Sequence, residues 1–125
     1  MPVKRPNRKA QAASPFAYGG LNRVIHERAR LGVLTSLLTH PSGLPFAEIK
    51  ALCALTDGNL NRHLQVLQGA NLVSVAKGPA RDRPQTFYRI TATGRKRYLE
   101  YLAVLEQVIL DGAAATKTPL PERSV

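Results

Sequence analysis

The stretch that decides the fold of this chain is LTDGNLNRHLQVLQGANLV, residues 55–73. Three of its leucines share one side of a helix because they are spaced four and three residues apart: Leu60, Leu64 and Leu67. Thr56 suits the start of that helix, since its hydroxyl can accept a backbone N–H of the first turn. Asn71 can adopt the left-handed conformation that ends a helix. The sequence therefore predicts a capped amphipathic helix over residues 56–70.

The opposite side of this predicted helix is polar. It carries the side chains of Asn59, Asn61, Arg62 and Gln65. Amide and guanidinium groups are the side-chain groups whose paired hydrogen bonds match base edges in the major groove of DNA. In a strongly basic chain, this polar face indicates a helix that contacts DNA.

The charge of the chain is unevenly distributed. The 125 residues make up about one domain, are 44% hydrophobic, and carry a formal net charge of +10. Residues 1–15 have four basic and no acidic groups, and residues 55–97 have eight basic and two acidic groups. Residues 98–125 have two basic and four acidic groups. Charge that served only solubility would be spread evenly, so this distribution favours a polyanionic partner that contacts one face.

Several classes of protein do not fit the sequence. Its single cysteine, Cys53, excludes an intramolecular disulfide and gives no sign of an oxidising compartment. No apolar run approaches the roughly 20 residues of a membrane span. The basic N-terminus is not followed by the hydrophobic segment of a secretory signal. We therefore expect a cytoplasmic protein that does not associate with membranes.

The first half of the chain predicts a flexible leader and two helices. Residues 1–15 lack apolar periodicity and are expected to form a flexible basic arm, which either grips DNA or has no specific role. From Leu21 the apolar pattern is helical to about Thr39, with a break near residues 26–28. A second helix is expected over Phe46–Leu52. Its inward residues are expected to be Phe46, Ile49 and either Leu52 or Cys53.

The second half predicts a hairpin and a long helix. Leu72–Lys77 and Gln85–Ile90 alternate as strands do, and the proline-containing basic loop 78–84 joins them. Thr91 or Thr93 is expected to cap a helix that ends near Leu110. Residues 112–125 are expected to form a flexible tail.

The predicted order of three helices, a strand, a basic loop, a strand and a helix is that of a winged helix-turn-helix. The fold class is therefore α+β, mainly α, with a two-stranded wing and a long C-terminal helix, in one domain over residues 16–111. The chain also resembles the small winged-helix transcriptional regulators related to the MarR and ArsR groups. The resemblance covers about Leu21 to Leu105 and is carried by HERARLGVLTSLL, LTDGNLNRHLQVLQGANLV and RPQTFYRITATGRKRYLEYL. It implies a homodimeric DNA-binding repressor or activator.

In a helix-turn-helix the N-terminal part of the second helix meets the bases. Gly58 would let the start of the helix at Thr56 approach a phosphate, which the free N–H groups there favour. The residues predicted to contact bases are Asn59, Asn61, Arg62 and Gln65, with Arg62 first. A solvated helix face is the alternative for each. Asp57 would repel phosphate, so a structural role at the helix start is favoured over a contact with cytosine.

Basic residues outside the helix extend the predicted DNA surface. Arg81 and Arg83 at the tip of the wing, and Lys77 at its root, are expected to contact phosphates or a narrow minor groove. For the basic cluster at residues 95–97, a phosphate contact and a solvated face are equally favoured. His63 borders the apolar stripe and is expected to be packed or locally hydrogen-bonded.

The last helix has a wider apolar stripe than one small domain needs. A second copy of this helix would cover it and place two recognition helices in successive major grooves. The predicted dimer residues are Tyr98, Leu102, Leu105 and Ile109. The alternative is that the helix folds back on the first helix of its own chain.

The predicted function is that of a sequence-specific regulator of transcription that binds double-stranded DNA. The three histidines lie on different elements and no catalytic motif is present, so we expect neither an enzyme nor a cofactor. Cys53 without closely spaced ligands makes a poor metal site. The alternative function is a winged helix that contacts protein or RNA, although the polar face lacks the aromatic residues that stack on RNA bases. The DNA site, the direction of regulation and any small-molecule effector stay open.

Overall fold

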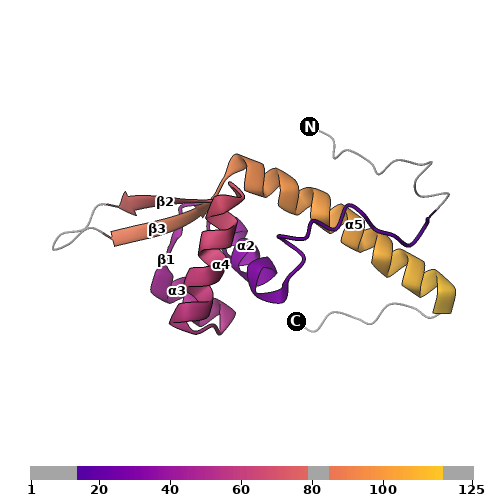
Figure 1. Cartoon of the computed structure of the whole chain (residues 1–125), viewed down its shortest axis with the longest axis horizontal. Helices are drawn as coiled ribbons and strands as arrows, with labels where there is room; N and C mark the ends of the chain where they lie inside the picture. The colour runs from indigo at the N-terminus through magenta and orange to yellow at the C-terminus, as the bar shows by residue number, and fades with distance from the viewer. Residues whose placement is uncertain (1–13, 79–84, 117–125) are drawn as a thin grey trace. The chain divides into compact units, whose positions relative to one another are not determined.

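A computed structural model describes residues 14–78 and 85–116. They fall into two compact units, one formed by Asn22–Tyr98 and the other by residues 14–21 with residues 99–116. The elements in chain order are α2 (Arg28–Thr39), β1 (Leu44–Pro45), α3 (Phe46–Cys53), α4 (Asp57–Gly69), β2 (Val73–Gly78), β3 (Gln85–Ile90) and α5 (Ala92–Thr116). The predicted mainly helical α+β class is confirmed (Figure 1).

The sheet has three antiparallel strands in the order β1-β3-β2. The predicted hairpin is confirmed, with pairs that run from Val73 opposite Ile90 to Gly78 opposite Gln85. The sequence did not predict β1, a two-residue strand that places Leu44 opposite Tyr88. Two residues that include a proline carry no strand periodicity, so only the pairing with β3 defines this strand. The predicted two-stranded wing is thus part of a three-stranded sheet.

The core of the Asn22–Tyr98 unit is formed by aliphatic residues of all three helices, the sheet and the segment before α2. Its most buried members are Ile25, Val33, Leu34, Leu37, Ile49, Leu60, Leu64 and Leu67. The three leucines of α4 predicted from their spacing are each at most 1% exposed. Burial of this stripe holds α4 against the other helices and leaves its polar side outward.

α2 begins where the sequence predicted a break. Its first turn is capped by Glu27, whose carboxylate accepts hydrogen bonds from the backbone N–H groups of Ala29 at 3.1 Å and Arg30 at 2.9 Å. The residues before it form a short turn, in which the His26 N–H donates to the Asn22 carbonyl at 2.7 Å. Glutamate is an unusual residue at this position, where serine, threonine, asparagine and aspartate are preferred.

The turn between α3 and α4 is tight. Ala54 adopts the left-handed conformation with φ of 53°, and the Leu55 N–H donates to the Lys50 carbonyl at 3.2 Å. Of the two residues expected to face inward at the end of α3, Cys53 is half-buried and Leu52 is 59% exposed. The structure therefore selects Cys53 as the inward residue.

The start of α5 is tied to the end of α4. The Thr91 hydroxyl caps α5 by accepting from the Gly94 N–H at 2.8 Å, and it donates to the Asn71 carbonyl at 2.7 Å. A Cβ at Gly94 would collide with the Leu72 carbonyl oxygen, so this close approach requires glycine. The predicted end of the helix near Leu110 was wrong, since α5 continues to Thr116.

In the second unit, the segment of residues 14–21 lies along one face of α5. The Tyr18 hydroxyl donates to the Asp111 carboxylate at 2.6 Å, and a Cβ at Gly20 would lie 2.7 Å from the Val104 side chain. The hydrogen bond from Tyr18 lowers the pKa of Asp111, and the same bond raises the pKa of Tyr18. No helix in the described part of the chain has the length and apolarity needed to cross a membrane.

Candidate nucleic-acid interface

The N-terminus of α4 has the cap that its sequence predicted. The Thr56 hydroxyl accepts a hydrogen bond from the Asn59 N–H at 3.2 Å. At Asp57, the first residue of the helix, the carboxylate pairs with Lys50 Nζ at 2.8 Å. This ion pair joins α3 to α4 across the turn and offsets the negative charge at the helix start. This contact supports the structural role that the sequence favoured for Asp57.

The outward face of α4 is exposed. The residues predicted to contact bases are all exposed: Asn59, Asn61, Arg62 and Gln65. The side chains of Asn61, Arg62 and Gln65 have no hydrogen-bond or ion-pair partner among residues 14–78 and 85–116. Gly58 is also exposed, and a Cβ there would meet nothing within 4 Å. This end of the helix thus offers free donors to a partner without the cost of breaking internal bonds.

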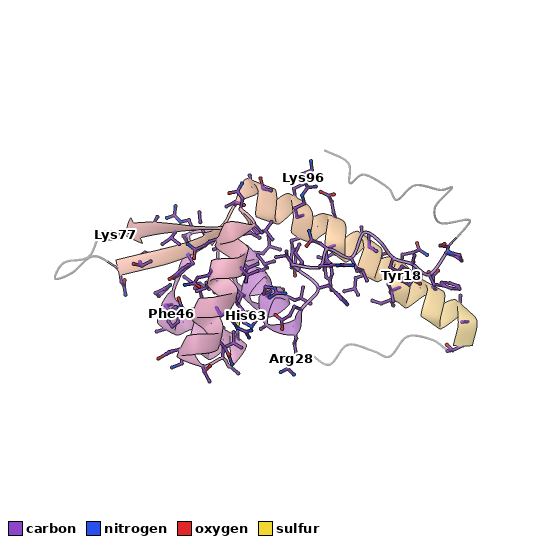
Figure 2. All side chains as sticks on the ribbon, in the orientation of Figure 1. Tyr18, Arg28, Phe46, His63, Lys77 and Lys96 are labelled. Carbon is purple, nitrogen blue, oxygen red and sulfur yellow. The ribbon has the colours of Figure 1, made fainter. Side chains whose placement is uncertain are left out.

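His63 lies on the other side of α4 and is 6% exposed, which confirms that it is packed. Its Nδ1 atom is 3.5 Å from a Glu27 carboxylate oxygen and 3.4 Å from an Arg30 guanidinium nitrogen. Figure 2 places His63 on the side of α4 that faces α2. The Glu27 carboxylate therefore caps α2 and also contacts His63 of α4. This link is not evident from the sequence, whose one local signal of it is the helix break at residues 26–28.

The environment of Glu27 favours its charged form. Burial by itself would raise the pKa of this carboxyl. The hydrogen bonds from the Arg30 and Ala29 N–H groups and the nearby charges of His63 and Arg30 outweigh burial and lower it. Since the folded pKa is below the unfolded value, the ionised carboxylate stabilises the fold above the unfolded pKa. That contribution is lost as the pH falls through the folded pKa.

Glu27→Gln is expected to lower the free energy of unfolding at pH 7 by about 0.5–1 kcal/mol, because it removes a charged cap that is partly exposed. The difference between the two proteins should shrink as the pH falls from 4.5, the ordinary value, through the lower value of the folded protein. Urea denaturation at several pH values measures both quantities. A difference that is constant with pH would show that the charge of Glu27 does not stabilise the fold.

The other residues predicted to contact DNA or a second copy of the chain differ in their exposure. Lys77 is exposed on β2, and Arg95 and Lys96 are exposed in the first turns of α5. Arg81 and Arg83 lie outside the described residues. Tyr98 was predicted to lie at a dimer interface, but in the structure it is part of the core. It is 5% exposed, and its hydroxyl lies 2.7 Å from the Thr35 hydroxyl within its own unit.

A groove of about 850 Å³ lies between α2, the α3–α4 turn and α4, all within the Asn22–Tyr98 unit. Two residues of the predicted DNA-contacting face, Asn59 and Arg62, form part of its wall. This groove is not evident from the sequence, because its walls come from three separate segments within residues 27–40, 52–55 and 59–63. Within residues 14–78 and 85–116, no cluster of three or more His, Cys, Asp or Glu residues is arranged to hold a metal ion.

The chain matches the family described as the winged helix DNA-binding domain over residues 29–109. It is 33% identical over 69 residues to an uncharacterized protein of Methanocaldococcus jannaschii. The aligned region covers 53% of this chain and 75% of that protein. Among solved structures, it is similar to a transcriptional regulator homologue from Pyrococcus horikoshii, with 34% identity and a TM-score of 0.65. That similarity covers 73% of this chain and 88% of the other.

The fold is also that of the transcriptional regulator MOSR of Mycobacterium tuberculosis, which was solved in complex with DNA. The two chains are 20% identical with a TM-score of 0.59, over 86% of this chain and 77% of the other. These similarities indicate a winged helix that binds DNA. The fold, the β2–β3 hairpin and the outward polar face of α4 agree with this. The protein is a DNA-binding transcriptional regulator, and its chain belongs to the winged helix DNA-binding domain family.

Proposed function

We propose that the protein binds a specific DNA sequence by placing the start of α4 in the major groove. The single observation that carries this proposal is the outward face of α4, whose Arg62 guanidinium is exposed and without a partner among the described residues. Arginine donates paired hydrogen bonds to guanine, the commonest specific contact in the major groove. Thr56 and Gly58 bring the helix start close to a phosphate, and Asn59, Asn61 and Gln65 lie beside Arg62.

The wing is proposed to contact the DNA backbone or the adjacent minor groove. Lys77 is exposed near the end of β2 and precedes residues 79–84, which include Arg81 and Arg83. Contacts to phosphates fix the register of a protein on DNA without reading its sequence. In this scheme α4 supplies sequence preference, and the wing supplies affinity. The protein acts as a regulator without enzymatic activity of its own, and the proteins similar to it that have a stated role are transcriptional regulators.

We further propose that the protein acts as a homodimer through α5. Leu102 and Ile109 are 36% and 44% exposed, and Leu99 and Leu110 are also exposed. Leu102 and Ile109 are seven residues apart and share a face roughly opposite to Val104 and Asp111, the face that residues 14–21 cover. Exposed aliphatic residues in a continuous stripe are typical of protein–protein interfaces. Leu105 is half-buried and lies at the edge of this stripe, one turn after Leu102 and one turn before Ile109 along the helix.

Selection of bound sequences from a random DNA pool tests sequence-specific binding directly. We expect an enriched site with two inverted halves whose centres are about one helical turn, or a multiple of it, apart. Enrichment of a single half would leave α4 as the DNA-binding element and contradict the dimer. Absence of any enriched sequence would favour the alternative, a winged helix that contacts protein or RNA.

Arg62→Ala is expected to weaken binding to the selected site by about 1–3 kcal/mol, roughly 10- to 100-fold, because it removes a paired contact to a base. Binding to random DNA should weaken much less. Titration of both DNAs by fluorescence anisotropy measures the two losses. Lys77→Ala is the matched control, since loss of a phosphate contact should weaken both DNAs alike. If Arg62→Ala weakens binding to the selected site and to random DNA equally, Arg62 contacts a phosphate and not a base.

A further inference from the structure

The buried histidine of α4 takes no part in the proposed contacts with DNA. Among residues 14–78 and 85–116, His63 is the one buried histidine, lysine, arginine, aspartate or glutamate. Burial of a polar side chain is costly unless it is hydrogen-bonded, and an apolar side chain of similar size would fill the same space without that cost. The position of His63 therefore indicates a function beyond packing.

The two polar partners of His63 are themselves held at the start of α2. The Glu27 carboxylate, 3.5 Å from His63 Nδ1, accepts two backbone N–H groups of the first turn of α2. The Arg30 guanidinium, 3.4 Å from the same Nδ1 atom, donates through its Nε to the Val24 carbonyl at 2.6 Å. Backbone hydrogen bonds thus fix the direction of both partners. His63 is the side chain through which this anchored pair contacts α4.

The apolar contacts of α4 fix its direction less strictly than this polar contact does. Leu60, Leu64 and Leu67 are each at most 1% exposed and hold α4 in the core. Apolar attraction is non-directional, whereas a contact between polar atoms depends on their distance and angle. A rotation of α4 by about 10° would move a side-chain end at about 6 Å from the helix axis by about 1 Å. Arg62 directly precedes His63, so such a rotation would displace its guanidinium.

We propose that His63 is a positioning residue for DNA recognition, whose contact with Glu27 fixes the rotation of α4 about its axis and so directs Arg62 to a base. This inference rests on the proposed function of Arg62. A lysine contact to phosphate tolerates a small rotation, because an ammonium group acts as a point charge. Loss of the His63 contact therefore lowers the preference for the selected site more than it lowers affinity for DNA in general. It changes stability little, since buried polar groups can add conformational specificity without adding stability.

The ratio of the Kd values for random and selected DNA measures this preference, and it cancels any change in charge that acts on every sequence alike. His63→Leu replaces the imidazole with an apolar side chain that suits a buried site but cannot form a hydrogen bond. We expect this variant to lower the ratio roughly five- to tenfold, the value of one hydrogen bond. Its midpoint in urea should stay close to that of the unaltered protein.

Two further variants make the test specific. His63→Asn is the matched control, because its amide can occupy the position of Nδ1, and it should keep the ratio within about twofold. Glu27→Ser tests the same contact from α2. Serine is a preferred residue at the start of a helix, so α2 stays capped, but the shorter side chain removes the carboxylate that contacts His63. The ratio should fall in this variant, and adding His63→Leu should lower it no further than His63→Leu alone, since both act through one contact.

The direction of α4 can also be measured without DNA. Residual dipolar couplings of the Cα–Hα bonds, which lie across the helix axis, report how α4 is rotated relative to α2 in the free protein. We expect the α4 couplings to change in His63→Leu and in Glu27→Ser, while those of α2 stay the same. In His63→Asn both sets should match the unaltered protein. Unchanged α4 couplings in Glu27→Ser and in a folded His63→Leu overturn the proposal.

The DNA measurements overturn the proposal in three ways. The ratio stays unchanged in a folded His63→Leu, His63→Asn loses as much as His63→Leu, or the losses from His63→Leu and Glu27→Ser simply add. If His63→Leu does not fold, an unchanged ratio in Glu27→Ser overturns it instead. If the unaltered protein selects no DNA sequence, the proposed function fails, and the dipolar couplings alone decide whether His63 positions α4.

Discussion

Leu102→Glu is expected to convert the protein from a dimer to a monomer, as measured by sedimentation. Leu102 lies near the middle of the exposed stripe on α5 and is 36% exposed in one chain. In a two-fold interface the same residue occurs twice, so the variant brings two carboxylates into an apolar contact. Burial of unpaired charges is costly enough to separate the subunits. Affinity for a two-half DNA site should then fall by roughly 100-fold or more, because the second half-site contact is no longer intramolecular.

A matched control separates the interface from a general effect of charge on α5. Ala115→Glu adds the same charge at an exposed position of the same helix, on the side away from Leu102 and Ile109. This control should remain a dimer and bind DNA normally. If Leu102→Glu also remains a dimer, the interface lies elsewhere and the stripe has another partner.

Leu64→Ala is expected to lower the free energy of unfolding by about 2–5 kcal/mol, because it leaves a cavity in the core behind α4. Leu64 is 1% exposed and lies between Leu60 and Leu67, which are both fully buried. The loss is a large part of the stability of a small domain. Urea denaturation measures it, and the midpoint should fall while the slope stays the same.

Val66→Ala is the control for helix propensity and loss of side-chain volume. Val66 lies on the same helix but is 38% exposed, so its truncation should cost less than about 1 kcal/mol. Similar losses in the two variants would contradict the conclusion that the leucine stripe holds α4 in place. DNA binding by folded Leu64→Ala at low temperature should be close to normal, since this side chain does not face the DNA.

The sequence determined those features whose causes lie within a few residues. The limits of α4 follow from its leucine spacing, the Thr56 hydroxyl and the left-handed Asn71, whose φ is 60°. The side of α4 that faces outward follows from the same spacing. The hairpin strands alternate in sequence, and Thr91 caps α5 as expected. These parts of the fold and the polar face of the candidate DNA interface were predictable, because local hydrogen bonds and side-chain periodicity decide them.

Tertiary structure decided the features that join distant segments. β1 exists only because Leu44 and Pro45 pair with residues more than 40 positions later. Tyr98 belongs to the core because its hydroxyl contacts Thr35, 63 positions earlier. His63 meets Glu27, and Arg62 lies across a groove from Arg28, only because α2 packs beside α4. Residue spacing within one helix carries no information about which residue of another helix comes opposite. Packing of the core fixes those pairs, and with them the groove between α2 and α4.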